Sequence, residues 1–437
     1  MSASNTQIAT IEKLSHDGRG IARINGKTTF ISGALTNEVV TFHYTRRKRA
    51  FDEAQIDSVL EASSARVAPS CPNYGVCGGC SLQHLDSSMQ IKEKQLLFLE
   101  MLARTARAQP DIILPELLHN SWNYRSKARV SVRYDTNTQK IKMGFREKNN
   151  PSEIVSALEC KILNNRIISA LELIQPVIES LDNPGCIAQI ELAAGQNALA
   201  LIIRHLSELS LRDLSLLREY AEKAEVRVYL QPSGPDSISL YSPESIPDQL
   251  HYILPAHDVL LNFNPTDFTQ VHADLNILMV DQAIKLLELE SSDHVLDLYC
   301  GMGNFSLPIA RKCAHVVGIE GGSAMVERAE NNADFNGIKN TTFVCENLEK
   351  DGSLNAFSAR EFQKVLLDPP RTGAQAVIKQ MQRLQPKRIV YVSCHPMTLA
   401  RDAWILIHEQ GYRLAAAGVM DMFPHTAHVE SMALFIK

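Results

Sequence analysis

Residues 294–304 read HVLDLYCGMGN, an apolar segment that runs into a loop with two glycines. The apolar part predicts a buried strand, and Gly301 and Gly303 let the backbone approach a ligand closely at the carboxyl end of that strand. Nicotinamide dinucleotide sites usually have the motif G-x-G-x-x-G. Here Gly303 is followed by Asn304, Phe305 and Ser306, so the third glycine of the motif is missing. The stretch therefore predicts a strand–loop–helix ligand site that does not bind NAD.

Four more apolar segments follow, with room for a helix between them. They are HVVGIE (315–320), TTFVCEN (341–347), KVLLDPP (364–370) and RIVYVSC (388–394). Strands that alternate with helices in this way predict an α/β fold with a parallel, Rossmann-like sheet from about residue 256 to residue 437. The last two apolar segments, GVMDMF and VESMALFIK, are too close for a helical crossover, so we expect them to pair antiparallel.

The rest of the 437-residue chain predicts two further domains. Residues 8–60 read as short strands joined by turns, which predicts a small five-stranded, OB-like β-barrel in a domain 1–62. Residues 63–255 predict a central β-rich domain. A helix is expected from Ser88 to about Ala108, with Leu96, Leu99, Leu102 and Ala103 at helical spacing, and it is a candidate to pack on the C-terminal domain.

Composition favours a cytoplasmic protein. The hydrophobic fraction is 45%, no apolar run approaches the roughly 18 residues that span a bilayer, and the start MSASNTQ lacks a secretory apolar region. Nine scattered cysteines do not resemble a secreted disulfide framework. The net charge of −5 restricts any nucleic-acid contact to a local basic patch. One such patch is predicted on a strand from Tyr124 to Tyr134, whose alternation places Arg125, Lys127, Arg129 and Arg133 on one face.

Polar residues end several of the predicted strands. Glu320 ends the second strand, where an acid can accept hydrogen bonds from ribose hydroxyls, and Asn347 after the third could hold an adenine edge. The fourth strand ends in Asp368-Pro-Pro-Arg371, and Arg371 stands where amino-group methyltransferases carry an aromatic residue. Because the carboxyl ends of parallel strands share one edge, these residues are expected to meet there.

The fifth strand ends in Ser393-Cys394-His395-Pro396. A lone cysteine is usually buried and inert. Cys394, however, precedes a helix that should begin near Pro396, and a helix N-terminus lowers the pKa of a thiol from its reference of about 8.5. The position therefore favours a thiolate nucleophile.

Four segments, DLYCGMGNF, LDPPRTG, VSCHPMTLARD and MFPHTAHVES, are similar to those of the S-adenosylmethionine-dependent RNA uracil-C5 methyltransferase family, over essentially the whole chain. The resemblance implies Cys394 as the nucleophile and Glu430 as the base. His425 and His428, in the same segment as Glu430, are alternative bases on chemical grounds. It also implies a set of residues around the cofactor or the target: Gln270, Tyr299, Asn304, Glu320, Asn347 and Asp368. His395 departs from the family, which usually has Asn there.

The chemistry of uracil explains why such a site needs a cysteine and a base. C5 of uracil is a poor nucleophile, but a thiolate that adds to C6 makes C5 enolate-like and able to attack a sulfonium methyl group. A base must then remove the C5 proton before the thiolate can leave.

Three cysteines lie within ten residues, Cys71, Cys77 and Cys80, and Cys160 could supply a fourth thiolate. Four thiolates suit either zinc or an iron–sulfur cluster, and the residues alone do not choose between them. The resemblance implies a [4Fe–4S] cluster. The N-terminal barrel resembles a TRAM domain, and Arg46-Arg47-Lys48-Arg49 could contact phosphate or form a solvated loop.

A TRAM-like barrel together with a cysteine cluster resembles the bacterial branch of the family named for uracil 1939 of 23S ribosomal RNA. The resemblance implies that RNA as the partner, 5-methyluridine as the product, a monomer, and no DNA or membrane partner. Three alternatives stay open: another rRNA or tRNA uracil, a non-catalytic iron–sulfur RNA-binding protein, and a DNA cytosine-C5 methyltransferase. In the last class the nucleophile follows a proline, whereas Pro396 comes two residues after Cys394.

Overall fold

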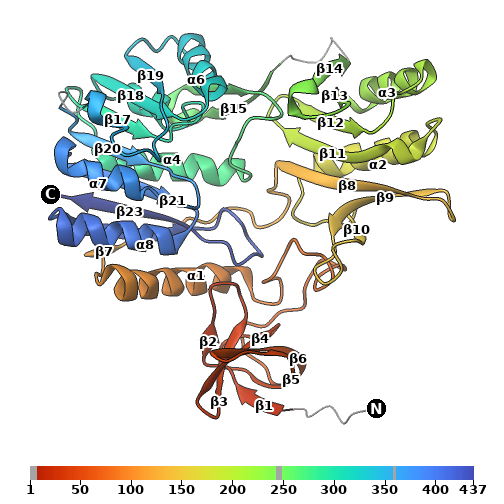
Figure 1. Cartoon of the computed structure of the whole chain (residues 1–437), viewed down its shortest axis with the longest axis horizontal. Coiled ribbons are helices and arrows are strands. Elements are labelled where there is room, and N and C mark those ends of the chain that lie inside the picture. The colour runs from red at the N-terminus through yellow and green to blue at the C-terminus, as the bar shows by residue number, and fades with distance from the viewer. Residues whose placement is uncertain (1–6, 243–248, 358–360) are drawn as a thin grey trace.

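The computed structural model describes residues 7–242, 249–357 and 361–437. These residues form three large sheets of six, seven and eight strands and a separate two-stranded hairpin. Figure 1 shows the seven- and eight-stranded sheets side by side, with the N-terminal barrel below them. In the described part of the chain, no helix is both long and apolar enough to cross a membrane.

The N-terminal sheet contains six strands, so the prediction of five is wrong by one. Its strands are β1 Gln7–Thr10, β2 Lys13–Leu14, β3 Gly20–Ile24, β4 Lys27–Ser32, β5 Val39–Arg47 and β6 Phe51–Glu61. The first expected strand is divided because its backbone changes partner: β1 pairs with β5 and β2 pairs with β3. The amide of Ile11 still bonds to Glu38 near β5, whereas that of Glu12 already bonds to Ile21 in β3. This change of partner closes the barrel.

The central sheet has the order β10-β9-β8-β11-β12-β13-β14. Its elements are β8 Lys127–Asp135, β9 Lys140–Arg146, β10 Ile154–Ser156, α2 Asn165–Glu179, β11 Ile187–Ala194, β12 Leu199–His205, α3 Leu211–Ala224, β13 Val226–Gln231 and β14 Ser239–Ser242. In β8 the predicted alternation is confirmed, since Val130 and Val132 are buried while Arg129 and Arg133 are exposed. The strand begins at Lys127, later than predicted.

The C-terminal sheet has the order β19-β18-β17-β20-β21-β23-β22-β7. Its strands are β7 Ile112–Ile113, β17 His294–Leu298, β18 His315–Glu320, β19 Thr341–Cys345, β20 Lys364–Leu367, β21 Arg388–Ser393, β22 Arg413–Met420 and β23 Glu430–Ile436. The five strands from β17 to β21 are parallel, and β23 lies antiparallel between β21 and β22, as predicted. The strand order reverses between β17 and β20, the position where open α/β sheets bind ligands.

Helices cover both faces of this sheet (Figure 1). They are α1 Ser87–Met101, α4 Ala273–Leu287, α5 Ser306–Ala310, α6 Ser323–Phe335, α7 Gln375–Leu384 and α8 Pro396–Trp404. Residues of α4, α5 and α6 share one apolar core with Val295 of β17, and residues of α1, α7 and α8 share a second core with Leu296 and Leu298. Because side chains alternate along a strand, β17 contributes to both cores. The predicted Rossmann-like fold is confirmed.

The helix expected at 88–108 forms as α1 with a further turn at Leu102–Ala106, and it packs on the C-terminal sheet. The face inferred for it is wrong in part, because Leu96 is 59% exposed. The buried residues of α1 are Gln90, Ile91, Lys94, Gln95 and Phe98. Three of these five residues are polar, so the spacing of apolar residues in the sequence could not identify the buried face of α1.

A hairpin of β15 Leu250–Leu254 and β16 Val259–Phe263 straddles the domain boundary expected at 255/256. Its apolar residues, among them Leu254 and Leu261, belong to the core shared with α4, so the hairpin packs with the C-terminal sheet.

Candidate active site

The glycine loop follows β17 and turns away from the sheet before α5. Tyr299, Gly301 and Gly303 all have positive φ angles, 63°, 54° and 95°, which glycine adopts without steric cost and tyrosine does not. Glu320, at the end of the neighbouring β18, accepts hydrogen bonds from the amides of Gly301 (3.1 Å) and Gly322 (3.0 Å). The carboxylate predicted to bind ribose thus also fixes the loop.

Asn304 lies at the end of this loop, where two residues hold its side chain. Its Oδ1 accepts hydrogen bonds from the hydroxyl of Tyr252 (2.9 Å) and the amide of Asn276 (3.0 Å), and its own amide donates to Asn276 Oδ1 (2.9 Å). Tyr252 and Asn276 also line a cavity of about 240 Å³ together with the predicted site residue Gln270. Sequence reasoning missed Tyr252 and Asn276, because neither lies in a recognisable motif.

Two carboxyl groups lie at the ends of the central strands. Burial raises the pKa of Asp368, after β20, to about 7. Burial also raises the pKa of Asp297 to about 7, although the hydroxyl of Ser306 donates to its Oδ2 at 2.5 Å. Asn347 follows β19 and is exposed, with its Oδ1 accepting from the amide of Glu349 (2.9 Å).

Cys394 lies between β21 and α8 and is half-buried. The backbone amide of His395 donates to Ser393 Oγ (3.1 Å) and its carbonyl accepts from Thr398 Oγ1 (2.9 Å), so these two hydroxyls order the loop. The expectation of a lowered thiol pKa is wrong. Burial, then Glu430 and Asp368, raise the pKa of Cys394 to about 11, and only Arg371 among these side chains opposes them.

Glu430 begins β23 and is 5% exposed. Burial and the nearby Asp368 raise its pKa well above the ordinary value, and Arg371 and Lys94 oppose the shift. Cys394, Glu430, Asp368 and Arg371 therefore lie close enough to affect one another, as expected for strand ends at one edge of a sheet.

The alternative base His425 is engaged elsewhere. Its ring stacks on Trp122 at 3.8 Å between centroids, and burial lowers its pKa to about 4. A group that weakly basic is a poor proton acceptor, which leaves Glu430 and the exposed His428 as candidates.

The barrel touches this site. A Cβ atom on Gly18, in the turn between β2 and β3, would lie 3.0 Å from Leu82 Cδ2 and 3.4 Å from Ala427 Cβ. The turn therefore packs directly on the loop that carries Glu430.

The four predicted ligand cysteines, Cys71, Cys77, Cys80 and Cys160, lie close enough for their thiols to affect one another. Burial, and after it the thiols of Cys160, Cys77 and Cys71, raise the pKa of Cys80 to about 12. Their proximity suits a thiolate ligand set. Among the residues that the structure describes, however, no group of three or more His, Cys, Asp or Glu is placed to hold a single metal ion.

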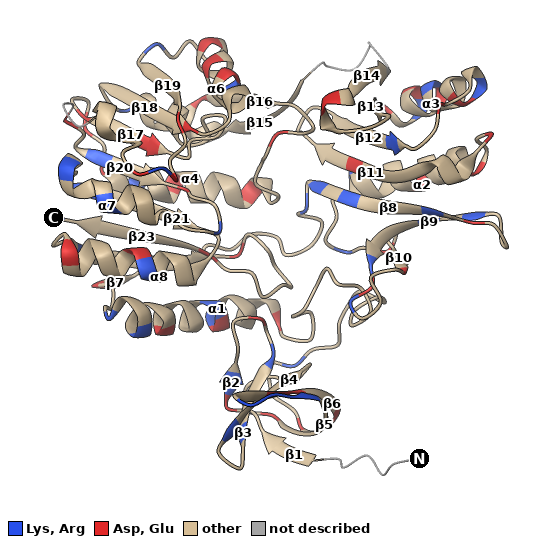
Figure 2. Ribbon diagram, in the orientation of Figure 1, with Lys and Arg blue, Asp and Glu red and all other residues tan. Residues whose placement is uncertain are grey.

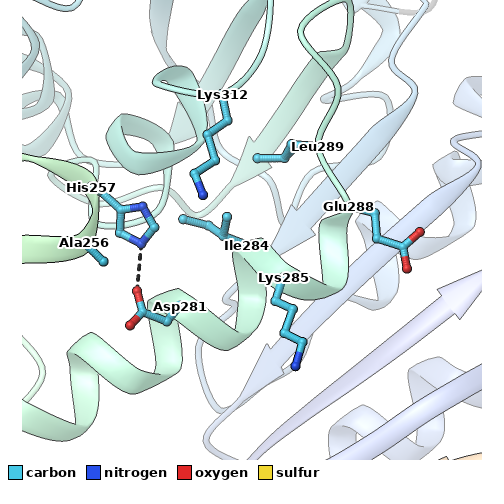
Figure 3. Close-up of a pocket in the computed structure, with 8 residues that line it drawn as sticks. All are labelled: Ala256, His257, Asp281, Ile284, Lys285, Glu288, Leu289 and Lys312. Carbon is cyan, nitrogen blue, oxygen red and sulfur yellow. Dashed lines mark hydrogen bonds and ion pairs between the residues drawn. The ribbon is translucent and has the colours of Figure 1, made fainter.

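A larger cavity, of about 590 Å³, contains none of the predicted site residues. Figure 3 shows its lining, from α4 and the segments around it, with His257 bonded to Asp281 at 2.7 Å. Size alone therefore does not identify the reactive site.

Comparison with solved structures defines the class of fold. The structure of a tRNA (uracil-54, C5)-methyltransferase from Pyrococcus abyssi in complex with S-adenosyl-L-homocysteine is similar, with a TM-score of 0.76, 23% identity, and coverage of 98% of this chain and 100% of that chain. At that identity the likeness shows a shared fold, that of a methyltransferase.

Sequence comparison then defines the family. The family model described as tRNA (Uracil-5-)-methyltransferase matches residues 89–437, and that of the TRAM domain matches residues 5–55. A 23S rRNA (uracil(1939)-C(5))-methyltransferase RlmD from Legionella pneumophila is 50% identical over 99% of this chain and 97% of its own. One from Xanthomonas campestris is 48% identical over 98% and 96%. The chain belongs to the uracil-C5 methyltransferase family, as its motifs predicted.

Proposed function

We propose that this protein transfers a methyl group from S-adenosylmethionine to C5 of a uracil in 23S ribosomal RNA, the position numbered 1939 in the names of its relatives. The observation that carries the proposal is the meeting of Cys394, Glu430, Asp368 and Arg371 beside the glycine loop. The identity of about 50% with relatives of that activity, over nearly the whole chain, supports the choice of RNA. We place the reaction in the cytoplasm, where ribosomal RNA is made in bacteria.

The cofactor would lie along the carboxyl edge of the sheet. In this proposal Glu320 accepts from ribose hydroxyls, Asn347 meets the adenine, and Tyr299, Asn304 and Gln270 line the rest of the site. The cavity lined by Gln270 supports the last assignment. When bound, S-adenosylmethionine supplies an electrophilic methyl group on a sulfonium centre. The carboxylates of Asp297 and Asp368 suit a cofactor that carries positive charge.

Cys394 provides the nucleophile. Its thiolate forms a bond to C6 of the uracil, and the C5=C6 electron pair moves toward C5. C5 would then bond to the methyl carbon as the bond between that carbon and the sulfonium sulfur breaks, so that S-adenosylhomocysteine leaves with the electron pair. Arg371 is the nearby cation that favours the thiolate form of Cys394, and it also favours the ionised form of Glu430.

Glu430 completes the reaction. Its carboxylate takes the C5 proton, the electron pair restores C5=C6, and the S–C6 bond breaks to return the Cys394 thiolate. A buried carboxyl with a raised pKa is a stronger base when ionised than a solvated one, because burial disfavours its charge.

RNA contacts are proposed on the basic face of β8. Figure 2 shows Lys and Arg along β8 and β9, and exposed Arg129 and Arg133 pair only at the surface, with Glu191 and Glu153. Phe268 is 72% exposed near the site and could stack on the flipped target base, a contact worth about 1–3 kcal/mol. In the barrel, Arg46 to Arg49 add positive charge at the end of β5.

We also propose that Cys71, Cys77, Cys80 and Cys160 hold a [4Fe–4S] cluster. Four half-buried thiols form a donor set of the right chemistry, since bound iron would favour their thiolate forms. Burial and the neighbouring thiols raise the pKa of Cys77, Cys80 and Cys160, so these side chains lie close to one another. Such a cluster would join the loop at 71–80 to Cys160 of the central domain.

Trapping tests the mechanism. In RNA substituted with 5-fluorouracil, fluorine cannot leave C5 as a proton does, so wild-type protein with cofactor should form an adduct that survives denaturation. Cys394→Ala should form none, and Cys345→Ala, which removes an exposed cysteine, should behave as wild type. Mapping the adduct identifies the base. Methylation of ordinary RNA by Cys394→Ala would exclude the covalent route, and cofactor binding without any wild-type adduct would favour the non-catalytic reading.

A further inference from the structure

Helix α1 buries two polar side chains one turn apart against the loop that carries Glu430. Gln90 is fully buried and Lys94 is 2% exposed. The loop, residues 421–429, joins β22 to β23 and ends at Glu430. The contact joins segments separated by more than 320 residues in sequence.

Lys94 holds the start of the loop. Its Nζ donates to Asp421 Oδ1 at 2.6 Å and to the carbonyl of Phe423 at 3.1 Å, and the side chains of Lys94 and Asp421 are 2% and 4% exposed. A buried ion pair contributes little net stability to a fold, because the cost of desolvating the two charges offsets much of their attraction. An apolar pair of similar volume often stabilises a fold equally well. A role in the active site therefore explains the presence of this ion pair better than stability does.

Gln90 holds the middle of the same loop. Its Oε1 accepts from the amide of His425 at 2.7 Å, and its Nε2 lies 3.1 Å from His425 Nδ1. The carbonyl of His425 accepts in turn from the amides of Ser81 and Leu82, both at 2.9 Å. The loop is therefore fixed on the side of α1 before it reaches Glu430.

Four charged or titratable groups act on Glu430. Asp368 and burial disfavour its ionised form, Arg371 and Lys94 favour it, and the Cys394 thiol is close enough to respond to it. Lys94 is the cation among them that is itself almost fully buried, so its charge is little screened by solvent.

We propose that Lys94 is a positioning residue for removal of the C5 proton: through Asp421 and Phe423 it places the loop that ends at Glu430, and its charge favours the ionised base. This inference rests on the proposed role of Glu430. It predicts a defect confined to the second half of the reaction, because bond formation by Cys394 and methyl transfer do not require the base.

The variants separate this role from folding. Lys94→Met leaves Asp421 buried without its cation, so it should lower the melting temperature and slow turnover together. The double variant Lys94→Met/Asp421→Leu removes both charges and should recover most of the melting temperature. Lys92→Met, an exposed lysine on the same helix, is the matched control.

The readout is the fate of ordinary, unfluorinated RNA. We expect the double variant to transfer about one methyl group per protein rapidly and then to accumulate a denaturation-resistant, methylated protein–RNA adduct, as Glu430→Gln should. Release of product from that adduct should slow at least tenfold, and its half-maximal pH should move upward, because Glu430 loses a cation that favours its charge. Lys92→Met should match wild type.

Different results would contradict the proposed role of Glu430 and the proposed role of Lys94. If Glu430→Gln turns over without accumulating adduct, the proposed role of Glu430 is wrong. If Glu430→Gln accumulates adduct but the refolded, stable double variant turns over normally with an unchanged pH profile, Lys94 is structural and this inference is overturned.

Discussion

The hydroxyl of Tyr252, in the hairpin strand β15, donates a 2.9 Å hydrogen bond to the side chain of Asn304, at the end of the glycine loop. Tyr252→Phe removes that bond and leaves the ring in place. We expect S-adenosylmethionine to bind roughly 2- to 10-fold more weakly, the equivalent of about 0.5–1.5 kcal/mol. Calorimetric titration of the cofactor measures the change.

Tyr241→Phe is the control for this prediction. Its hydroxyl donates to the carbonyl of Leu214 at 2.7 Å, within the central domain. It should leave cofactor affinity unchanged. Equal affinity in Tyr252→Phe and wild type would mean that Asn304 keeps its position through Asn276 alone.

Glu320 offers a stronger test of the same loop. Glu320→Gln removes the charge that two backbone amides, those of Gly301 and Gly322, now share, and it removes an acceptor for ribose hydroxyls. Hydrogen bonds to charged groups contribute about 1.5–3 kcal/mol, so affinity should fall roughly 10- to 100-fold. Glu330→Gln, on the exposed side of α6, controls for loss of one negative charge. A change below twofold would exclude Glu320 as a cofactor ligand.

Sequence was most informative where structure is local. The alternation in β8 and the glycine loop after β17 involve neighbours in the chain, and both appear as predicted, apart from the first residue of β8. The antiparallel pairing of β22 with β23 also followed from a short connection.

Sequence was least informative where distant segments meet. Gln90 and Lys94 look like the solvent face of α1, and their burial depends on a loop more than 320 residues away. The thiol pKa of Cys394 was mispredicted for the same reason: the helix N-terminus is visible in the sequence, whereas the burial of the thiol beside Glu430 and Asp368 is not. The pKa of a group in a site depends on its burial and on the charges around it, and these are set by the three-dimensional structure.

The cysteine group makes a prediction that needs no substrate. Protein purified without oxygen should be brown, with broad visible absorption and about four irons per chain, as expected for a [4Fe–4S] cluster. Cys80→Ser should lose the colour, since Cys80 interacts with all three other thiols. Cys345→Ser, at an exposed position, should keep it. Colourless protein with stoichiometric zinc would contradict the cluster.

The nucleophile makes a prediction about pH. The thiol of Cys394 has a pKa raised to about 11, so at pH 8 about one thiol in a thousand is ionised, and alkylation by iodoacetamide should speed up about tenfold per pH unit until the pH nears that value. Glu430→Gln removes a neighbour that raises the pKa and should speed alkylation at pH 8. Arg371→Met removes the cation that lowers it and should slow the reaction.

Mass spectrometry of the Cys394 peptide measures these rates, with the exposed Cys345 as an internal reference. In the free protein Cys394 should react at least about tenfold more slowly than Cys345 at pH 8, because the pKa of Cys394 is raised and its thiol is half-buried, whereas Cys345 is exposed. If Cys394 instead reacts faster, and Glu430→Gln changes nothing, then the N-terminus of α8 outweighs burial and the two carboxyls. Cys394 would then be ionised before RNA arrives, and Arg371 would not be needed to favour the thiolate.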